Sequence, residues 1–483
     1  MGYSSEAIKS RLLQKITQLI TGPYLKQSSE HCRIGNCTPV NFDNNLDLGG
    51  IRISGRRKIK VSSVLYIKYL TLFLAEWLYI WLVWLKSLVC FKSIKNAVIL
   101  YGVPAAELES ANRRRLADFL HAGPIRIFNN VESIFIQSAG ENIKANNNNI
   151  FYFKYPLFDL FAKSNSPKLD RMLFPIRHIE TFFSFILLSL RSPLTVLLYR
   201  DFSEHSVAQF LNRSNALKGI VITNSNWAQQ FLWMNKLIGR KYKLHMALYS
   251  QNNSPILYKD DNTCDVYHPI LRHLNVDHVY TWDCEYKDTL LRMGIHSDTT
   301  AIGPILWYKD SSIVSKRIRR GLTFCIFDVI PQSRKNLEAR GVLSSYYSVE
   351  NVSLFINDII SATKEVEKYL QCDVHIIMKQ KRRPSDQHSK SYALILKSLE
   401  SNDSFSVLSP DTSLYELADQ SDLSISFPFT SSAHVFSFKG KGSIFYDPTM
   451  EILGYDGLKD NMYFVSGYQE LTATLKVLSE KLQ

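Results

Sequence analysis

The sequence predicts an α/β protein with two domains, each built from alternating strands and helices, behind an N-terminal extension. The chain of 483 residues is longer than the roughly 100–200 residues that one domain commonly holds. Beyond residue 95, short apolar runs alternate with segments of helical periodicity, which is typical of a sheet covered by helices. The alternation restarts after Gly303 and Pro304. We therefore expect an extension over 1–94 and domains over 95–310 and 311–483.

Composition narrows the class of protein and of partner. Hydrophobic residues make up 46% of the chain and charged residues 21%, which describes an ordinary globular protein and excludes wholesale disorder. The formal net charge of +13 and the 12% of aromatic residues favour an anionic partner: a nucleic acid, a negatively charged membrane surface or a phosphorylated small molecule. Seven scattered cysteines favour reduced thiols in the cytosol. No secretory signal is expected, because no apolar core with a cleavage site stands near the start.

An apolar segment over 64–91 is crowded with Leu, Ile, Trp and Tyr. Lys68, Glu76 and Lys86 interrupt it, so it holds no unbroken run near the roughly 18–20 residues that a transmembrane helix needs. At about 100° per residue, these charges fall within an arc of about 80° and form one polar stripe. Aromatic and basic residues in and before the segment favour a helix in a membrane interface, namely Trp77, Tyr79, Trp81, Trp84, Arg52, Arg56, Arg57, Lys58 and Lys60. A buried core helix and a true span are the alternatives.

The first domain is expected to hold seven strands with helices between them. Each expected strand is a short apolar run, and several end at Gly, Pro, Asn or Ser, which punctuate local structure. The expected strands are 97–101, 125–128, 133–138, 194–199, 219–223, 243–249 and 278–282. Helices are expected over 109–120 and 182–190, and through Trp227 and Phe231.

The second domain is expected to contain a compact strand-turn-helix unit near its end. Strands are expected at 322–329, 374–378, 405–408, 422–427 and 443–446, and helices at 352–370, 389–399, 413–418 and 468–482. Pro428 cannot donate to a sheet ladder, so it should end the strand before it. The hydroxyls of Thr430, Ser431 and Ser432 can then cap a helix that runs until Gly440.

Three loops of the second domain carry cations or hydroxyls after successive strands. In doubly wound folds the carboxyl ends of the strands hold the ligand, and a helix N-terminus there attracts phosphate. Ammonium and guanidinium groups can bind a nucleotide phosphate or a sugar carboxylate. The predicted anion-binding residues are Lys379, Lys381, Arg382, Pro410, Thr412, Thr430, Ser431 and Ser432. The alternative is a solvated basic loop beside a well-capped helix.

Candidates for acid or base chemistry lie in the first domain, where a carboxylate or imidazole could deprotonate a hydroxyl across a cleft. Asp201 and Glu204 follow the strand expected at 194–199 and are the predicted catalytic residues. The other candidates are Glu107, His205, Asp283 and Glu285. The D-x-E pair at 283 and 285 could hold a divalent metal but fits a strand-to-helix turn equally well, so no metal site is predicted.

Several activities lack their motifs. The chain holds no G-x-S-x-G elbow, no G-x-x-x-x-G-K-[ST] loop and no strand-linked G-x-G-x-x-G. Hydrolase, P-loop and dinucleotide-binding functions are therefore without support. No nucleic-acid recognition module is visible, and no nucleic-acid partner is predicted.

The tetrapeptide Pro428-Phe429-Thr430-Ser431, between a strand and a helix, resembles the motif that names the PFTS-motif polysaccharide biosynthesis proteins of bacterial surface-glycan clusters. Neighbouring segments fit the same family, namely Ser250-Gln251-Asn252, Phe327-Asp328-Val329, Lys379-Gln380-Lys381-Arg382 and Tyr446-Asp447-Pro448. The resemblance covers roughly residue 95 to the end. Two βα domains with a phosphate-suited site in the second also resemble the GT-B architecture of nucleotide-sugar glycosyltransferases.

A looser similarity is to GT-B sialyltransferases and Kdo transferases, in which a basic segment and a hydroxyl pair hold a CMP-sugar. Ser431 and Ser432 match the hydroxyl pair. Lys379, Lys381 and Arg382 stand where those enzymes have a Lys or Arg with a His-Pro pair, which is missing here. This departure leaves the CMP assignment and the sugar open.

These resemblances imply two Rossmann-like domains that face a cleft, the first for the acceptor and the second for the donor. They imply a glycosyltransferase that needs no metal or cofactor and moves a sugar from a nucleotide-sugar to a growing O-antigen or capsule. A CMP-linked nonulosonic acid or Kdo-like sugar is one candidate donor. The acceptor would be a glycan or lipid-linked glycan at the cytoplasmic face of the inner membrane, with the protein peripherally attached. A non-catalytic assembly or scaffold protein of the same pathway is the alternative.

Overall fold

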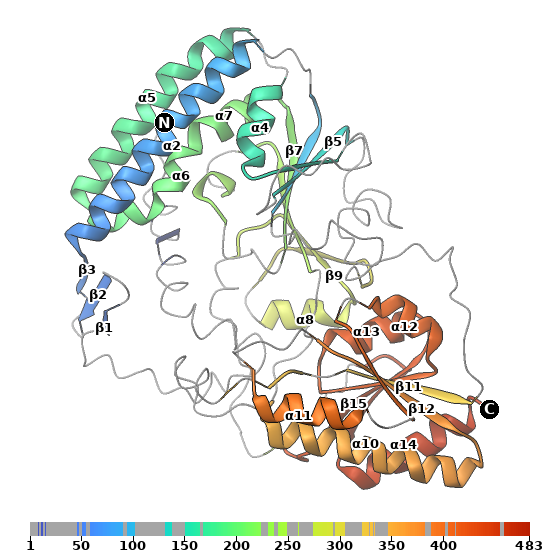
Figure 1. Cartoon of the computed structure of the whole chain (residues 1–483). Helices are drawn as coiled ribbons and strands as arrows, with labels where there is room; N and C mark the ends of the chain where they lie inside the picture. Colours follow the sequence, from blue (N-terminus) through green and yellow to red (C-terminus); the bar gives the residue numbers. More distant parts are fainter. Residues whose placement is uncertain are drawn as a thin grey trace.

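The structure, a computed structural model, contains two parallel sheets covered by helices (Figure 1). It describes residues 8, 11–12, 15, 46–47, 51–54, 58–89, 94–101, 131–137, 150–164, 168–223, 230–235, 240–248, 259, 274–292, 295–304, 321–327, 329–331, 333, 346–381, 388–400, 404–410, 412–454 and 458–483. The predicted α/β class with two Rossmann-like units is confirmed. We call the units the N-terminal and C-terminal domains, and the limits predicted for them at 94 and 310 stay a prediction.

The N-terminal domain is built on a seven-stranded parallel sheet in the order β10-β9-β8-β7-β4-β5-β6. Its strands are β4 (Ala97–Tyr101), β5 (Ser133–Gln137), β6 (Ile150–Phe153), β7 (Leu217–Thr223), β8 (Lys243–Ala247), β9 (His278–Thr281) and β10 (Asp298–Ala301). From β4 the chain adds β5 and β6 on one side, and it then adds β7 to β10 on the other. Strand addition therefore reverses between β4 and β7, and open α/β sheets bind ligands at such a switch point.

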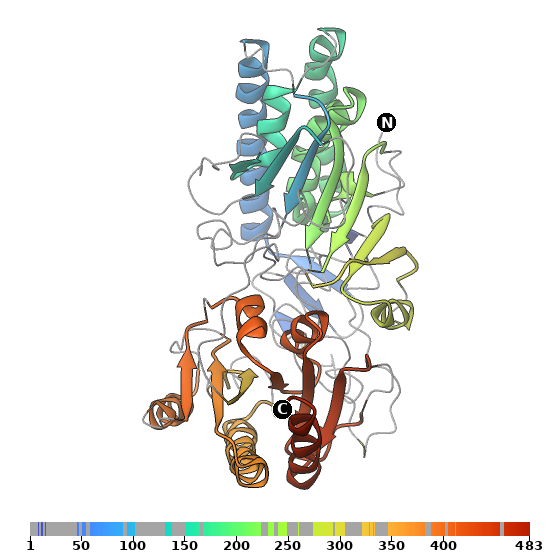
Figure 2. The ribbon, with the colours of Figure 1, turned by 90° about the vertical axis from the view of Figure 1, so that its right-hand side faces the viewer.

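The C-terminal domain has a six-stranded parallel sheet in the order β13-β12-β11-β14-β15-β16. Its strands are β11 (Leu322–Phe327), β12 (Val374–Lys379), β13 (Phe405–Leu408), β14 (Leu423–Ser426), β15 (Gly442–Asp447) and β16 (Met462–Ser466). Here strand addition reverses between β11 and β14. In the part of the domain that the structure describes, helices α10 (Val349–Leu370), α11 (Lys390–Leu399), α12 (Leu414–Gln420), α13 (Ser431–Phe438) and α14 (Tyr468–Glu480) cover the sheet. Figures 1 and 2 show α12 and α13 on the side that faces the N-terminal domain.

The two domains share part of one core. Tyr415 of α12 donates its phenol to the carbonyl oxygen of Pro304 at 2.5 Å, and Val435 and Phe436 of α13 belong to the apolar cluster of the N-terminal domain. Gly303 adopts φ +81°, and a Cβ there would lie 2.7 Å from the ring of Phe438. The helix that follows the PFTS tetrapeptide is therefore packed at the junction of the domains.

The strand expected at 194–199 is absent, and that prediction was wrong. The segment is a 3-10 helix, η2 (Pro193–Leu198), followed by α6 (Tyr199–Ser203). Pro193 occupies the first helical position, where its missing N–H is not needed. Thr195 to Leu198 are all buried, so the run lacks the alternation that distinguishes a half-buried strand.

Other differences are smaller. The helix expected at 182–190 is the second half of a longer one, α5 (Lys168–Arg191), and Phe231 precedes a 3-10 turn, η3 (Leu232–Met234). Strands β6, β10 and β16 were not expected. The helix expected at 109–120, the strand expected at 125–128 and residue Trp227 lie outside the described residues.

The N-terminal extension contributes a small antiparallel sheet and the expected apolar helix. The sheet consists of β1 (Leu46–Asp47), β2 (Ile51–Ser54) and β3 (Lys58–Val61), and the helix is α2 (Ser63–Val89). Trp77 and Trp84 donate their indole N–H groups to backbone oxygens of α5, so they face protein and are not membrane anchors. Glu76 accepts a hydrogen bond from Ser203 at 2.5 Å and is not part of a solvated stripe. That part of the sequence interpretation was wrong.

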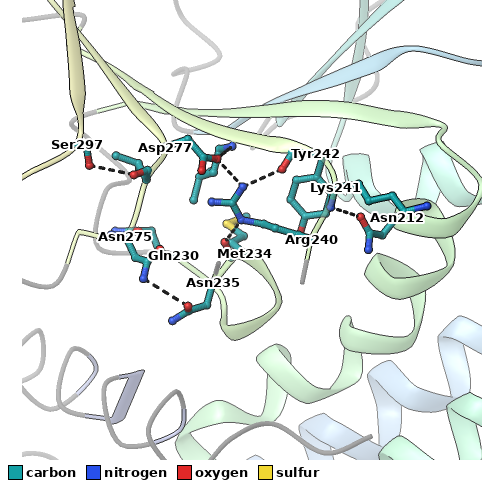
Figure 3. A network of polar contacts seen from close by, with 12 residues as sticks. Asn212, Gln230, Met234, Asn235, Arg240, Lys241, Tyr242, Asn275, Asp277 and Ser297 are labelled. Carbon is teal, nitrogen blue, oxygen red and sulfur yellow. Dashed lines mark hydrogen bonds and ion pairs between the residues drawn. The ribbon is translucent and has the colours of Figure 1, made fainter. Parts of the chain in front are cut away.

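A polar network ties the amino ends of β8 and β9 (Figure 3). Arg240 donates to the carbonyl oxygens of Met234 at 2.6 Å and Tyr242 at 2.7 Å. It also pairs with Asp277, whose Oδ2 accepts the N–H of Leu244 at 2.7 Å. The network lies at the edge opposite the carboxyl ends of the strands, so its role is structural.

Candidate active site

The carboxyl ends of the C-terminal strands form one row. Leu408, Lys379, Phe327, Ser426 and Phe445 are successive partners across β13, β12, β11, β14 and β15. Neighbouring strands lie about 4.8 Å apart, so the loops after β12, β13 and β14 leave the sheet within roughly 15 Å of one another. The three loops that the sequence singled out therefore share one edge, next to the switch point between β11 and β14. Their role in binding a ligand stays a prediction.

The PFTS tetrapeptide turns the chain sharply between β14 and α13. Phe429 adopts φ +61°, a left-handed conformation that is uncommon for a residue with a Cβ and costs about 1–3 kcal/mol. Its buried ring lies 5.6 Å from the ring of Phe445 and 5.9 Å from that of Phe464. The ring packing holds the strained backbone, and the turn brings Thr430 to the start of α13.

The Thr430 hydroxyl does not cap the start of α13. Thr430 occupies the N-cap position, but its side chain makes no capping hydrogen bond. Its Oγ1 instead donates to the carbonyl oxygen of Phe427 at 3.1 Å and lies 3.4 Å from Ser432 Oγ. The first N–H groups of a helix have no partner within the helix and attract anions. The predicted cap by the Thr430 hydroxyl is therefore not formed, and binding of an anion at this helix end stays a prediction.

Lys379 fixes the loop after β13. Its side chain is buried, and its Nζ donates to the carbonyl oxygens of Pro410 at 2.9 Å and Gln380 at 3.3 Å. The N–H of Thr412 donates to the carbonyl oxygen of Ser409 at 3.1 Å and closes a turn. Lys379 thus adds a positive charge at this edge while it holds the Pro410 loop in place. Lys381 is half-buried, and Arg382 lies outside the described residues.

Two serines at this edge were missed by the sequence analysis. Ser413 Oγ and Ser426 Oγ are buried and have no hydrogen-bond partner in the described part of the chain. On the same strand, the buried Ser424 donates to Ser443 Oγ at 2.9 Å. A buried hydroxyl without a partner costs free energy, so Ser426 is a polar group at this edge whose hydrogen bonding the protein leaves unsatisfied in the described residues. No direct signal was present in the sequence, because the alternation of two serines with apolar residues in β14 predicts a strand with one exposed face, whereas the structure buries both faces.

Asp201 is enclosed by protein groups. Its Oδ1 accepts a hydrogen bond from Arg11 Nε at 2.8 Å and another from the N–H of Leu232 at 2.6 Å. Both side chains of the ion pair are almost wholly buried. Asp201 lies on α6 and not after a strand, so the positional reason for choosing it was wrong. Its catalytic role stays a prediction.

Glu204 is enclosed in a similar way, at the residue that ends α6. One oxygen accepts from Arg200 Nε at 2.7 Å, and the other accepts from Trp233 Nε1 at 3.0 Å. Burial raises the pKa of Glu204, and the neighbouring Arg200 opposes that shift. The neighbouring His205 is buried as well, and burial lowers its pKa to about 3. These groups form one polar cluster inside the N-terminal domain.

Asp283 contacts α13, the helix that begins at Ser431 of the PFTS tetrapeptide. Its Oδ1 accepts the N–H of Tyr286 at 3.0 Å and so caps α8 (Glu285–Arg292). Its Oδ2 lies 3.5 Å from Nδ1 of His434, in the first turn of α13. This pair joins the two domains two residues after Ser432. The side chain of Glu285 is not described, and Glu107 lies outside the described residues.

A family model matches most of the chain. The model for the polysaccharide biosynthesis PFTS motif proteins matches residues 178–475, more than half of the chain. No match is found among curated proteins.

The solved structures whose backbones follow a similar path share little sequence identity with this chain. TarM is 12% identical over 59% of this chain and 52% of that chain, with a TM-score of 0.36, so the chain spans about half the length of TarM. A Methanocaldococcus jannaschii UDP-GlcNAc 2-epimerase, in complex with UDP-GlcNAc and UDP, is 12% identical over 80% of this chain and 93% of the epimerase chain, with a TM-score of 0.37. A Rickettsia africae glycosyltransferase is 11% identical over 80% of this chain and 89% of the glycosyltransferase chain, with a TM-score of 0.40. At such scores these likenesses decide nothing about chemistry.

The family assignment therefore rests on the sequence match and on the tetrapeptide itself. The matched region contains the whole C-terminal domain as far as α14 and includes the strand, turn and helix around Pro428 to Ser431. The resemblance inferred from the tetrapeptide is confirmed, and the chain belongs to the family of polysaccharide biosynthesis PFTS motif proteins.

Proposed function

We propose that the chain is a nucleotide-sugar-dependent glycosyltransferase of GT-B type that extends a bacterial surface polysaccharide. The main support is the position of the PFTS tetrapeptide. It opens α13 at the carboxyl edge of a doubly wound sheet, beside the switch point between β11 and β14 and at the junction of the two domains. Ligands of open α/β sheets bind at such a point, and the helix N-terminus suits a phosphate.

The C-terminal domain would bind the donor. The first N–H groups of α13 and the hydroxyls of Thr430, Ser431 and Ser432 would hold the donor phosphates. The charges of Lys379, Lys381 and Arg382 and the loop at Pro410 and Thr412 would border the same site. In the transfer step, an acceptor hydroxyl loses its proton to a base and attacks the anomeric carbon, while the bond to the phosphate oxygen breaks. The oxygen leaves with the electron pair, and a helix N-terminus and nearby cations stabilise that charge without a metal.

The N-terminal domain would bind the acceptor and supply the base if the reaction inverts. Asp201 and Glu204 remain our proposed bases. Each carboxylate already binds an arginine in the described structure. Because a base must reach the hydroxyl that it deprotonates, either residue would have to give up contacts with the protein to act as the base. Asp283 is a further candidate, because it contacts the first turn of α13 through His434.

The finer identity of the substrates is also part of this proposal. A CMP-linked nonulosonic acid or Kdo-like sugar fits the hydroxyl pair Ser431 and Ser432. An O-antigen or capsule glycan, free or lipid-linked, would be the acceptor. The enzyme would work in the cytoplasm, peripherally attached to the inner membrane.

A thermal-shift screen against CMP, UDP, GDP and their sugars, followed by a donor-hydrolysis assay, tests the proposal. We expect one nucleotide to stabilise the protein and its sugar to release free nucleotide slowly. The double variant Ser431→Ala/Ser432→Ala should lose both effects and keep its unliganded melting temperature. Ser398→Ala, at an exposed serine of α11, is the matched control and should behave like the unaltered protein. Retained transfer in the double variant would exclude this site, and a failure to bind any of the nucleotides would favour the scaffold function.

A further inference from the structure

Helices α2 and α5 pack as one antiparallel pair on the outside of the N-terminal domain (Figure 1). Three contacts set the register. From one contact to the next, the residue number on α2 rises and the residue number on α5 falls by the same amount, as expected for antiparallel helices. These contacts are Tyr66 with Ser189, Trp77 with His178 and Trp84 with Arg171. The pair therefore forms a layer two helices wide.

The inner face of this layer is committed to protein contacts. His178 is fully buried, with its Nδ1 2.8 Å from Ser206 Oγ on α7 (His205–Arg213) and its Nε2 3.0 Å from the carbonyl oxygen of Trp77. Burial lowers the pKa of His178 to about 4, so the ring is neutral near pH 7. Ser203 donates to Glu76 from α6. Both helices are long and apolar enough to cross a membrane, but neither can be surrounded by lipid while this face stays packed.

The outer face of the layer is apolar and exposed. On α5 the exposed apolar side chains recur every three or four residues, at Leu169, Met172, Ile176, Ile179, Phe183, Leu187 and Leu190. On α2 they include Val64, Ile67, Leu74, Leu78, Leu82, Leu85 and Val89. Less than a third of the most apolar window of each helix is buried, 22% on α2 and 28% on α5. Contiguous apolar patches of this extent mark interaction surfaces.

Exposed charges on the layer are concentrated at its ends. Lys68 and Arg191 lie at one end because the helices are antiparallel, and Lys86 lies at the other. Lys86 follows Lys68 by five helical turns, about 27 Å along the same side of α2. Between these lysines no charged side chain of α2 is exposed, and Glu180 is the exposed charge in the middle of the described α5. An apolar strip with cations at its ends is complementary to an anionic lipid surface.

We propose that α2 and α5 together form a docking surface that lies in the plane of an anionic lipid bilayer. Their outer side chains enter the interface, while Lys68, Lys86 and Arg191 contact the headgroups. The occupant is lipid and not a second copy of the chain. Pairing two such layers in either direction would bring cationic ends together, and like charges oppose association. This inference rests on the proposed membrane-bound acceptor, and it adds α5 and the in-plane orientation to it.

Flotation of the full chain with vesicles of equal parts phosphatidylglycerol and phosphatidylcholine tests this surface. Leu78→Glu/Leu82→Glu on α2 and Phe183→Glu/Leu187→Glu on α5 should each lower the vesicle-bound fraction at least tenfold. These positions are exposed, so the melting temperature should change little. Leu354→Glu/Leu394→Glu, at exposed leucines of α10 and α11, is the matched control and should leave flotation unchanged.

The outcomes separate the surface from the active site. Vesicles of phosphatidylcholine alone should bind the unaltered chain less, and Lys68→Gln/Lys86→Gln/Arg191→Gln should remove that preference for anionic lipid. The inference is overturned if the α5 variant floats normally, or if light scattering finds a dimer that the substitutions dissociate. Nucleotide binding in the thermal-shift assay should survive every surface substitution. Loss of nucleotide binding in Ser431→Ala/Ser432→Ala with intact flotation leaves this surface standing.

Discussion

The two polar regions that drew attention in the sequence differ in how their groups are paired. On and beside α6, Asp201 and Glu204 are buried, and each accepts two hydrogen bonds from nearby protein groups. At the PFTS tetrapeptide, Thr430 leaves the start of α13 without a side-chain cap. Ser426 Oγ beside it has no partner in the described residues. In the first region protein groups satisfy both carboxylates, whereas in the second region the Thr430 side chain makes no cap and Ser426 Oγ has no partner among the described residues.

This difference concerns which polar groups already have hydrogen-bond partners in the protein, and the ligand-binding and catalytic roles of both regions stay predictions. A buried charge is tolerated when its partners are supplied by the protein, and removing one partner leaves the other uncompensated. A ligand that supplies the missing hydrogen-bond partner stabilises an unpaired buried hydroxyl or an uncapped helix end. The position of a polar residue in the chain did not reveal which case applied. Its hydrogen-bond partners did.

Asp201→Asn should have the largest effect on stability. The substitution leaves Arg11 buried without its counter-ion, and breaking a buried ion pair costs about 3–5 kcal/mol. The free energy of unfolding, from urea denaturation followed by tryptophan fluorescence, measures the loss. Loss of transfer with unchanged stability would instead identify Asp201 as a catalytic group.

Arg177→Ala provides the comparison for that measurement. Arg177 pairs with Asp170 on α5 at 3.7 Å, and both side chains are partly exposed. Exposed pairs contribute about 0–1 kcal/mol, because water screens both charges. A large loss of stability in this variant would mean that exposure is a poor guide to the value of ion pairs in this protein.

Glu204→Gln should change the pH dependence of stability. Burial raises the pKa of Glu204, so the folded chain holds this proton more firmly than the unfolded chain does. The resulting stabilisation is present below the ordinary pKa, about 4.3, and is lost as pH rises through the raised pKa. Relative to the unaltered protein, Glu204→Gln should therefore become more stable as pH rises from 4 to 8 in urea denaturation.

The matched control for this slope is Glu350→Gln. Glu350 lies in the first turn of α10, and hydrogen bonds from its own backbone N–H and from Ser348 lower its pKa. Its contribution is present above the ordinary pKa and is lost as pH falls, so the relative slope should have the opposite sign. Equal slopes in the two variants would show that burial does not dominate at Glu204.

The sequence was most informative for short buried strands, and most clearly where a proline ends the strand. The strand expected at 422–427 before Pro428 is β14, and the strand expected at 374–378 is β12. Parallel strands then put their carboxyl ends on one edge, so the common position of three loops followed from the strand order. This much of the candidate site was predictable.

Side-chain partners were not predictable, because they come from distant parts of the chain. Arg11 and Asp201 are 190 positions apart. Asp201 resembled a free carboxylate after a strand, since a fully buried apolar run does not distinguish a strand from the 3-10 helix η2. Phe429 gave no sign of its positive φ, because no glycine or asparagine stands there.

Ser426→Ala should have the smallest effect on stability, and it tests directly whether the Ser426 hydroxyl lacks a partner in the protein. Ser426 and Ser424 are buried on the same strand, but only Ser424 has a partner among the described residues. Removing a bonded hydroxyl should cost about 1 kcal/mol at Ser424, whereas removing the unpaired one at Ser426 should leave the unliganded protein unchanged or slightly more stable. Urea denaturation of both alanine variants measures this. A stabilising nucleotide should then lose affinity for Ser426→Ala alone, and equal losses of stability would show that Ser426 already has a partner.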